Sequence, residues 1–180
     1  MKHTITSHQL RGRRDLERDA KHLAPHAIRH VSRAVSGRMP AVDITLTDPK
    51  GMADLGVQAE AELSGCTDPR RIGKARRESL RHTRDAAALA VPRADGSVLI
   101  LVNGEQHRTR EDLAITLVHE LTHAMQFSRR GVLDVIVRNL RAAYGIERQS
   151  RREARDFART LTEHEREAYE TERLAADLPH

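Results

Sequence analysis

The clearest hydrophobic pattern in the chain lies in residues 113–126, where apolar side chains recur three or four positions apart. An α-helix turns once in about 3.6 residues, so this spacing gathers those side chains into one stripe. Thr109 and Asp112, three residues apart, match a capping box, so the helix is expected to begin near Arg110. The stripe consists of Leu113, Leu117, Leu121 and Ala124.

Four more segments show helical spacing. Gly37 follows the first and Gly145 the third, and glycine is common immediately after a helix. Asp68 precedes Pro69 at the start of the second, a pairing typical of a helix N-terminus. The predicted helices cover residues 15–36, 70–82, 132–143 and 147–178.

Three segments show strand patterns. Residues 40–48 alternate apolar with polar side chains, as a half-buried strand does, and end in a turn at 48–51. Residues 86–91 and 98–102 are short apolar runs on either side of the turn at 92–96, which predicts a hairpin. The second hairpin strand is either a sheet edge that accepts an extended peptide or a strand paired on both sides.

The remaining stretches carry weaker patterns. Residues 1–12 are polar and basic and are expected to be a loose N-terminal arm. Residues 52–68 stay unassigned apart from a short helical piece at 58–63. No internal repeat divides the 180 residues, so a single domain over 1–180 is expected.

Composition narrows the function classes. The chain contains two Phe, two Tyr and no Trp, so the stacking platforms that bind single-stranded nucleic acid are scarce. The formal net charge is +5, and the densest positive patch is the predicted helix at 70–82. A solvated helix face explains that patch more simply than an acidic partner does, and nucleic acid is therefore not the expected partner.

The cellular compartment is predicted from the cysteine content and from the pattern of apolar residues in the chain. Cys66 is the single cysteine, which rules out a disulfide within the chain and favours a reducing compartment. Neither an apolar signal segment nor a run near the roughly 18 residues that span a bilayer is visible. We expect a cytoplasmic protein without a membrane partner, with a non-standard secretion route left open.

The helix at 113–126 carries the candidate chemistry, His119-Glu120-Leu121-Thr122-His123, an HExxH motif. The two histidines are four residues apart and share one helix face, where both imidazoles can reach one zinc ion. Glu120 lies between them, beside the place of a water molecule held by the metal. This geometry suits a general base.

A second row of histidines, His22, His26 and His30, also recurs at four-residue spacing. No acidic or cysteine side chain stands beside that row in the sequence. We interpret it as the polar edge of the first helix, with a second metal site as the alternative.

A hydrolytic zinc site needs three protein ligands, so a third must come from elsewhere. Gln126 and Arg129 occupy the positions where metzincins carry Gly and His, which excludes that class. Asp134 and Asp156 lack a supporting pattern. The last predicted helix supplies the other candidates, of which the first lies at the border of the apolar stripe: Glu165, then Glu167 as the alternative, then Glu172 and His164.

HELTHAMQ on one helix and E-x-E-A-Y on a later one resemble the zincin metallopeptidases of the gluzincin type, particularly the small minigluzincins. The resemblance covers residues 98–126 and 157–176. It implies an α+β, zincin-like fold with a small, mostly antiparallel sheet packed on the HExxH helix and a helical C-terminal part. It also implies the following site residues: His119, His123 and Glu165 as zinc ligands and Glu120 as the catalytic base.

The chain departs from the family at Tyr169, where several gluzincin families have an aspartate that orients a ligand histidine. This departure leaves the partners of the ligands open. Tyr169 and Tyr144 are candidate phenol donors to the oxyanion that forms during hydrolysis.

The function expected from these observations is a zinc metallopeptidase, in which a zinc-bound water attacks a peptide bond of a protein or peptide substrate. The alternative is a catalytically silent zinc-binding module, or a partner- or nucleic-acid-binding module that uses the basic helix at 70–82. Retention of Glu120 favours the enzyme, because a structural zinc site needs no base.

Overall fold

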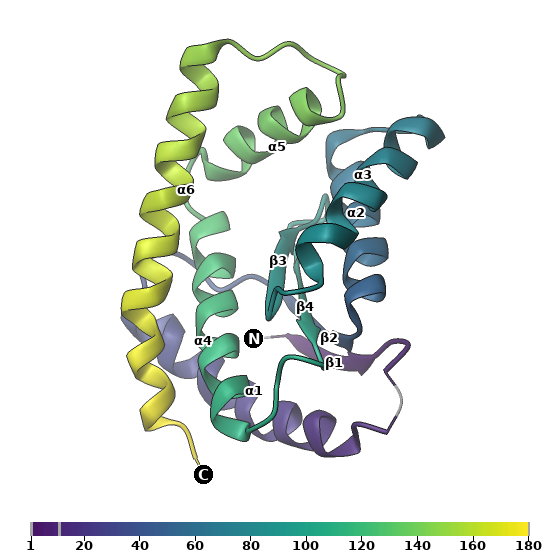
Figure 1. Ribbon diagram of the computed structural model, residues 1–180. Coiled ribbons are helices and arrows are strands. Elements are labelled where there is room, and N and C mark those ends of the chain that lie inside the picture. The colour runs from purple at the N-terminus through teal and green to yellow at the C-terminus, as the bar shows by residue number, and fades with distance from the viewer. Residues whose placement is uncertain (1, 11, 180) are drawn as a thin grey trace.

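The computed structural model describes residues 2–10 and 12–179, in which a four-stranded sheet lies between two layers of helices (Figure 1). The strands are β1 (His3–Ser7), β2 (Val42–Thr47), β3 (Ala88–Pro92) and β4 (Val98–Asn103). The helices are α1 (Arg14–Ala34), α2 (Pro49–Ser64), α3 (Pro69–Thr83), α4 (Arg110–Phe127), α5 (Val132–Ala143) and α6 (Arg151–Thr171), followed by the 3-10 helix η1 (Glu172–Asp177). Among the described residues, no helix is long and apolar enough to cross a bilayer. The predicted α+β class is confirmed.

The sheet has the order β1-β2-β4-β3. β1 pairs parallel to β2 and β2 parallel to β4, whereas β3 pairs antiparallel to β4. The expectation of a mostly antiparallel sheet is therefore wrong. The physical reason is connectivity, because the helices between β1, β2 and β4 return the chain in the same direction, and only the tight β3–β4 hairpin reverses it.

β4 is paired on both sides, and β3 forms the edge of the sheet. The second strand of the predicted hairpin is therefore a fully paired strand and not a sheet edge. Both faces of β4 are also covered. Val98, Ile100 and Val102 pack with α1 and α4, while Leu99 and Leu101 pack with α2. This double coverage explains the unbroken apolar run of β4.

α4 begins where predicted, at Arg110, and its capping box is complete. The amide of Asp112 donates to the Thr109 hydroxyl at 3.0 Å, and the Thr109 amide donates to the Asp112 carboxylate at 2.9 Å. Both bonds satisfy amides that the first turn of a helix leaves unpaired. The capping box thus sets the start of the helix that carries the HExxH motif.

The loose arm predicted for residues 1–12 is wrong in its middle part, because β1 pairs along its whole length with β2. The pairing rests on backbone hydrogen bonds, which need no apolar side chains. Thr6 and Thr45 add a side-chain hydrogen bond of 3.2 Å across the pair. The polar side chains of this strand concealed it in the sequence.

The turn assigned to residues 48–51 is in fact the first turn of α2, which also covers most of the unassigned segment. Asp48 caps α2 by accepting a hydrogen bond from the Gly51 amide at 2.7 Å, and Pro49 follows it at the first helical position. The same Asp-Pro pair marked α3, so the signal was present. A Cβ at Gly51 would lie 2.0 Å from the Thr47 hydroxyl, so the close approach of α2 to β2 requires glycine here.

The C-terminal helix predicted over 147–178 is shorter than expected. α6 begins at Arg151, because Ser150 and Glu153 form a capping box, and it gives way to η1 at Glu172. This change of helix type after Thr171 redirects the last residues toward α4, with which η1 is in contact.

Candidate metal centre

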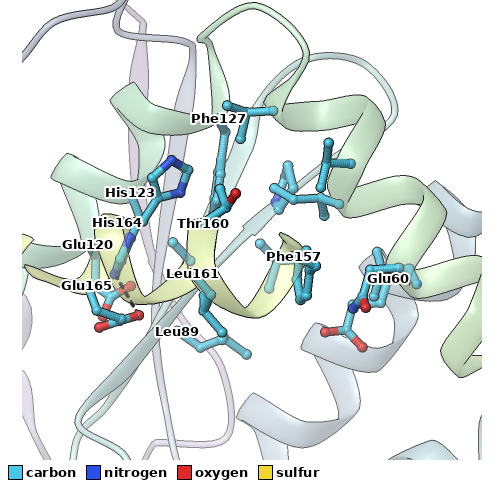
Figure 2. Close-up of a pocket in the computed structure, with 18 of the residues that line it drawn as sticks. Glu60, Leu89, Glu120, His123, Phe127, Phe157, Thr160, Leu161, His164 and Glu165 are labelled. Carbon is cyan, nitrogen blue, oxygen red and sulfur yellow. Dashed lines mark ion pairs between the residues drawn. The ribbon is translucent and has the colours of Figure 1, made fainter. Parts of the chain in front are cut away.

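His119 and His123 lie one turn apart on α4, and their Nε2 atoms are 3.1 Å from each other. Glu165 reaches them from the neighbouring helix α6. Its carboxylate oxygens lie 3.5 Å from the Nε2 of His119 and 3.4 Å from the Nε2 of His123 (Figure 2). Among the described residues, these three form the one group of His, Cys, Asp or Glu side chains whose ligand atoms converge, all within 4.8 Å of one another.

The outer nitrogen of each imidazole has a partner that sets its tautomer. The Nδ1 of His119 lies 2.8 Å from a carboxylate oxygen of Glu172, which can only accept, so Nδ1 carries the proton. The Nδ1 of His123 lies 2.8 Å from the amide oxygen of Gln126, which also accepts. When both imidazoles are neutral in this tautomer, the two Nε2 atoms present their lone pairs to the same point.

Two lone pairs and a carboxylate that face one another repel unless a cation lies between them. Imidazole nitrogen and carboxylate oxygen are the donor types that Zn²⁺ binds, and tetrahedral zinc accepts three protein ligands with one position open. Burial lowers the pKa of His123, which keeps its imidazole neutral and able to bind a metal. The donor set therefore fits zinc.

Glu172 accepts the hydrogen bond from Nδ1 of His119, the role that the resemblance gives to an aspartate at position 169. Tyr169 is instead an exposed ring that stands edge-on to His119, with 5.0 Å between the ring centroids. The carboxylate that orients the histidine thus comes from η1, three residues later in the chain. A hydrogen bond from ligand to carboxylate fixes the ring and makes the bare nitrogen more basic.

Gln126 is the first member of a longer chain of contacts behind His123. Its amide nitrogen donates to the carbonyl of His164 and to the carboxylate of Glu167, each at 2.9 Å. Arg129 holds that carboxylate with two hydrogen bonds of 2.7 and 2.6 Å and lowers the pKa of Glu167. Glu167, the alternative third ligand, is thus engaged away from the histidine nitrogens.

Replacing Glu167 with alanine is expected to weaken zinc binding by about 10–100-fold without abolishing it. The substitution removes one of the two acceptors of the Gln126 amide nitrogen and leaves the His164 carbonyl as the other, so His123 is held less firmly in the ligand orientation. Zinc affinity is measured by competition with a chromophoric chelator. Glu163→Ala, an exposed position on the same helix, is the matched control, and unchanged affinity in Glu167→Ala would refute the role of this contact chain.

Glu120 is buried beside the three ligand candidates and faces the edge strand β3. Burial, followed by the nearby charge of Glu165, raises the pKa of Glu120 to about 8, and a backbone hydrogen bond from Ala90 opposes the rise. These neighbours show that the Glu120 carboxyl group lies between the ligand candidate Glu165 and the backbone of the edge strand β3.

These residues open onto a cleft of about 390 Å³. β3 forms one side, and apolar residues of α5 and α6 form the other (Figure 2). Val135 and Leu161 keep 39% and 48% of their surface exposed, so apolar surface remains open to a ligand. The cleft thus offers apolar surface to a ligand beside the converging side chains.

The other candidate residues lie outside the group. Tyr144 is buried among Ala61 and Cys66, and its hydroxyl donates to the Val57 carbonyl at 3.3 Å, so it is not an oxyanion donor. Asp156 pairs with Arg159 at 3.0 Å. Asp134 lies on the exposed side of α5. His164 lies in the wall of the cleft and is not one of the three converging residues.

The histidine row of α1 lies on the helix surface, with 5.8 Å between the ring centroids of His22 and His26. The basic helix α3 is likewise exposed, and three of its cations have acidic partners within the chain. These pairs are Arg71 with Asp68, Lys74 with Glu78, and Arg76 with Asp54.

Two of the orienting side chains had little signal in the sequence. Gln126 stands three residues after His123, a spacing at which helix side chains meet, and that spacing was the available clue. Nothing in the sequence indicated that Glu172 orients His119, because the position of Glu172 depends on the change from α6 to η1.

Comparison of the chain with protein-family models, with curated proteins and with solved structures finds no match. The resemblance to gluzincin metallopeptidases therefore stays a prediction from the two motifs quoted above. The geometry of the three ligand candidates is independent of that resemblance, because it follows from distances within this chain.

Proposed function

We propose that this protein is a zinc-dependent peptidase. The observation that carries the proposal is the convergence of two histidine Nε2 atoms and a carboxylate beside the buried Glu120, at one end of an open cleft. Zinc bound by His119, His123 and Glu165 would polarise the carbonyl of a peptide bond and lower the pKa of water toward about 7.

The protein's own groups account for the proton transfers. A cation bound beside Glu120 would lower its raised pKa and favour the carboxylate, which accepts a proton from the attacking water and delivers it to the leaving nitrogen, as a general base and then a general acid. Its burial excludes competing bulk water. Glu172 and Gln126 act as positioning residues, because they hold the imidazoles and do not reach the reacting atoms.

The edge strand β3 supports an extended substrate. Its inner side is paired with β4, and its outer side borders the cleft. An extended peptide laid along this edge gains main-chain hydrogen bonds, and Ala90 brings the scissile bond beside Glu120. Tyr169, exposed next to His119, is the phenol positioned to donate to the oxyanion.

The test is a zinc titration of chelator-treated protein, with zinc content and cleavage of an unfolded, carboxymethylated protein followed together. We expect one zinc ion per chain, with hydrolysis rising in proportion to bound zinc. Absence of zinc binding would overturn the proposal. Tight zinc binding without cleavage would support the silent zinc-binding module instead, since its metal would be purely structural.

A further inference from the structure

Glu60 on α2 lies at the far end of the cleft from the metal ligands, with Phe157 and Leu161 between (Figure 2). A second cleft, of about 620 Å³, begins at the same place between α2, α3 and the end of α5. Both clefts are lined by Glu60, Ala88, Leu89 and Leu140. The two hollows therefore form a continuous path past β3, and Glu60 stands at their junction.

The carboxylate of Glu60 has no counter-charge. Among residues 2–10 and 12–179, none forms an ion pair with it or donates a hydrogen bond to it. Burial among apolar side chains raises its pKa, and no cation works against that rise. A half-buried carboxylate without a partner is costly, so its presence in a cleft wall points to a partner from outside.

Two cations that line the second cleft have other partners. The guanidinium of Arg71 donates to the Tyr144 carbonyl at 2.7 Å and pairs with Asp68 at 3.3 Å. Lys74 pairs with Glu78 at 3.8 Å. Both positive charges therefore have partners within the chain other than Glu60.

We propose that Glu60 is a specificity residue that binds a lysine or arginine side chain of the peptide substrate, an inference that rests on the proposed peptidase function. A basic side chain supplies the missing positive charge, and its apolar stem packs against Leu89 and Leu140. A peptide lying along β3 advances by about 3.3 Å per residue. Glu120 contacts Ala90 of β3, and Glu60 lies at the far end of the same cleft, so the basic residue stands at a fixed number of positions from the scissile bond.

Binding is tested in the Glu120→Gln background, in which peptides remain intact. The probes are fluorescein-labelled peptides of alanine and leucine with one arginine at successive positions, compared with norleucine at the same positions. We expect one position at which arginine tightens binding by about tenfold or more, measured by fluorescence anisotropy. Glu60→Gln removes this preference, whereas Glu62→Gln, an exposed position on the same helix, retains it.

A charge reversal makes the test independent of lost packing. Glu60→Arg is expected to prefer a glutamate peptide over the arginine peptide, and thermal melting checks that each variant is folded. Equal binding of arginine and norleucine peptides at every position, or an arginine preference that survives in Glu60→Gln, would overturn the proposal.

The two proposals fail separately. Cleavage by the zinc-loaded wild type without any Glu60-dependent preference retains the peptidase and removes the specificity site. Glu60-dependent peptide binding without cleavage retains the binding site and removes the hydrolysis.

Discussion

Replacing Glu120 with glutamine is expected to reduce peptide hydrolysis by about 10²–10⁴-fold, the usual contribution of a general acid–base group. Glutamine has almost the same shape but cannot accept the proton of the attacking water. Zinc content is expected to stay at one ion per chain, because Glu120 is not among the converging ligand atoms. Initial rates on an unfolded protein substrate and zinc content of the same samples give both results.

Glu111→Gln is the matched control, since Glu111 is exposed in the first turn of the same helix. It is expected to keep the wild-type rate. Wild-type hydrolysis in Glu120→Gln would show that another group transfers the proton. Loss of zinc in that variant would instead place Glu120 among the ligands.

Removal of a ligand is expected to have the largest effect on metal binding. His123→Ala and Glu165→Ala each delete one of three donors, so their zinc affinity should fall further than the about 10–100-fold expected when an orienting carboxylate is lost. We expect zinc affinity to be highest in the wild type, lower in Glu172→Ala and lowest in Glu165→Ala. Competition with a chelator measures all three proteins under one condition.

Thermal melting without zinc separates loss of a ligand from loss of the fold. Glu165 is partly exposed, and its charge raises the pKa of Glu120, so Glu165→Ala should not destabilise the metal-free protein. If Glu172→Ala loses more affinity than Glu165→Ala, the roles of the two glutamates as ligand and orienting residue are reversed.

The elements predicted best are those with chemical signals at their ends. α4 and α5 begin and end within a residue of expectation, because a capping box or a glycine borders each. β1 could not be predicted from its side chains, since its pairing with β2 uses the backbone. The direction of the strands follows from connections through α1 and α2, and the second of these helices was not recognised in the sequence.

The candidate site was predictable where it depends on spacing within one helix. His119, Glu120 and His123 need no tertiary information beyond the helix itself. Glu165 could be selected only as a residue at the border of an apolar stripe, because its distance from the histidines depends on how α6 packs on α4. Glu60 could not be found from the sequence, although it lies in the short helical piece predicted at 58–63, because its significance comes from the residues that surround it.

The walls around β3 also bear on aggregation. A free sheet edge is a template on which other β-strands can add, and natural proteins usually guard such edges. Here residues of α5 and α6 form the opposite side of the cleft that β3 borders. These walls stand beside the edge to which a strand of a second sheet would add. We expect them to hinder sheet-to-sheet assembly of the protein's own copies.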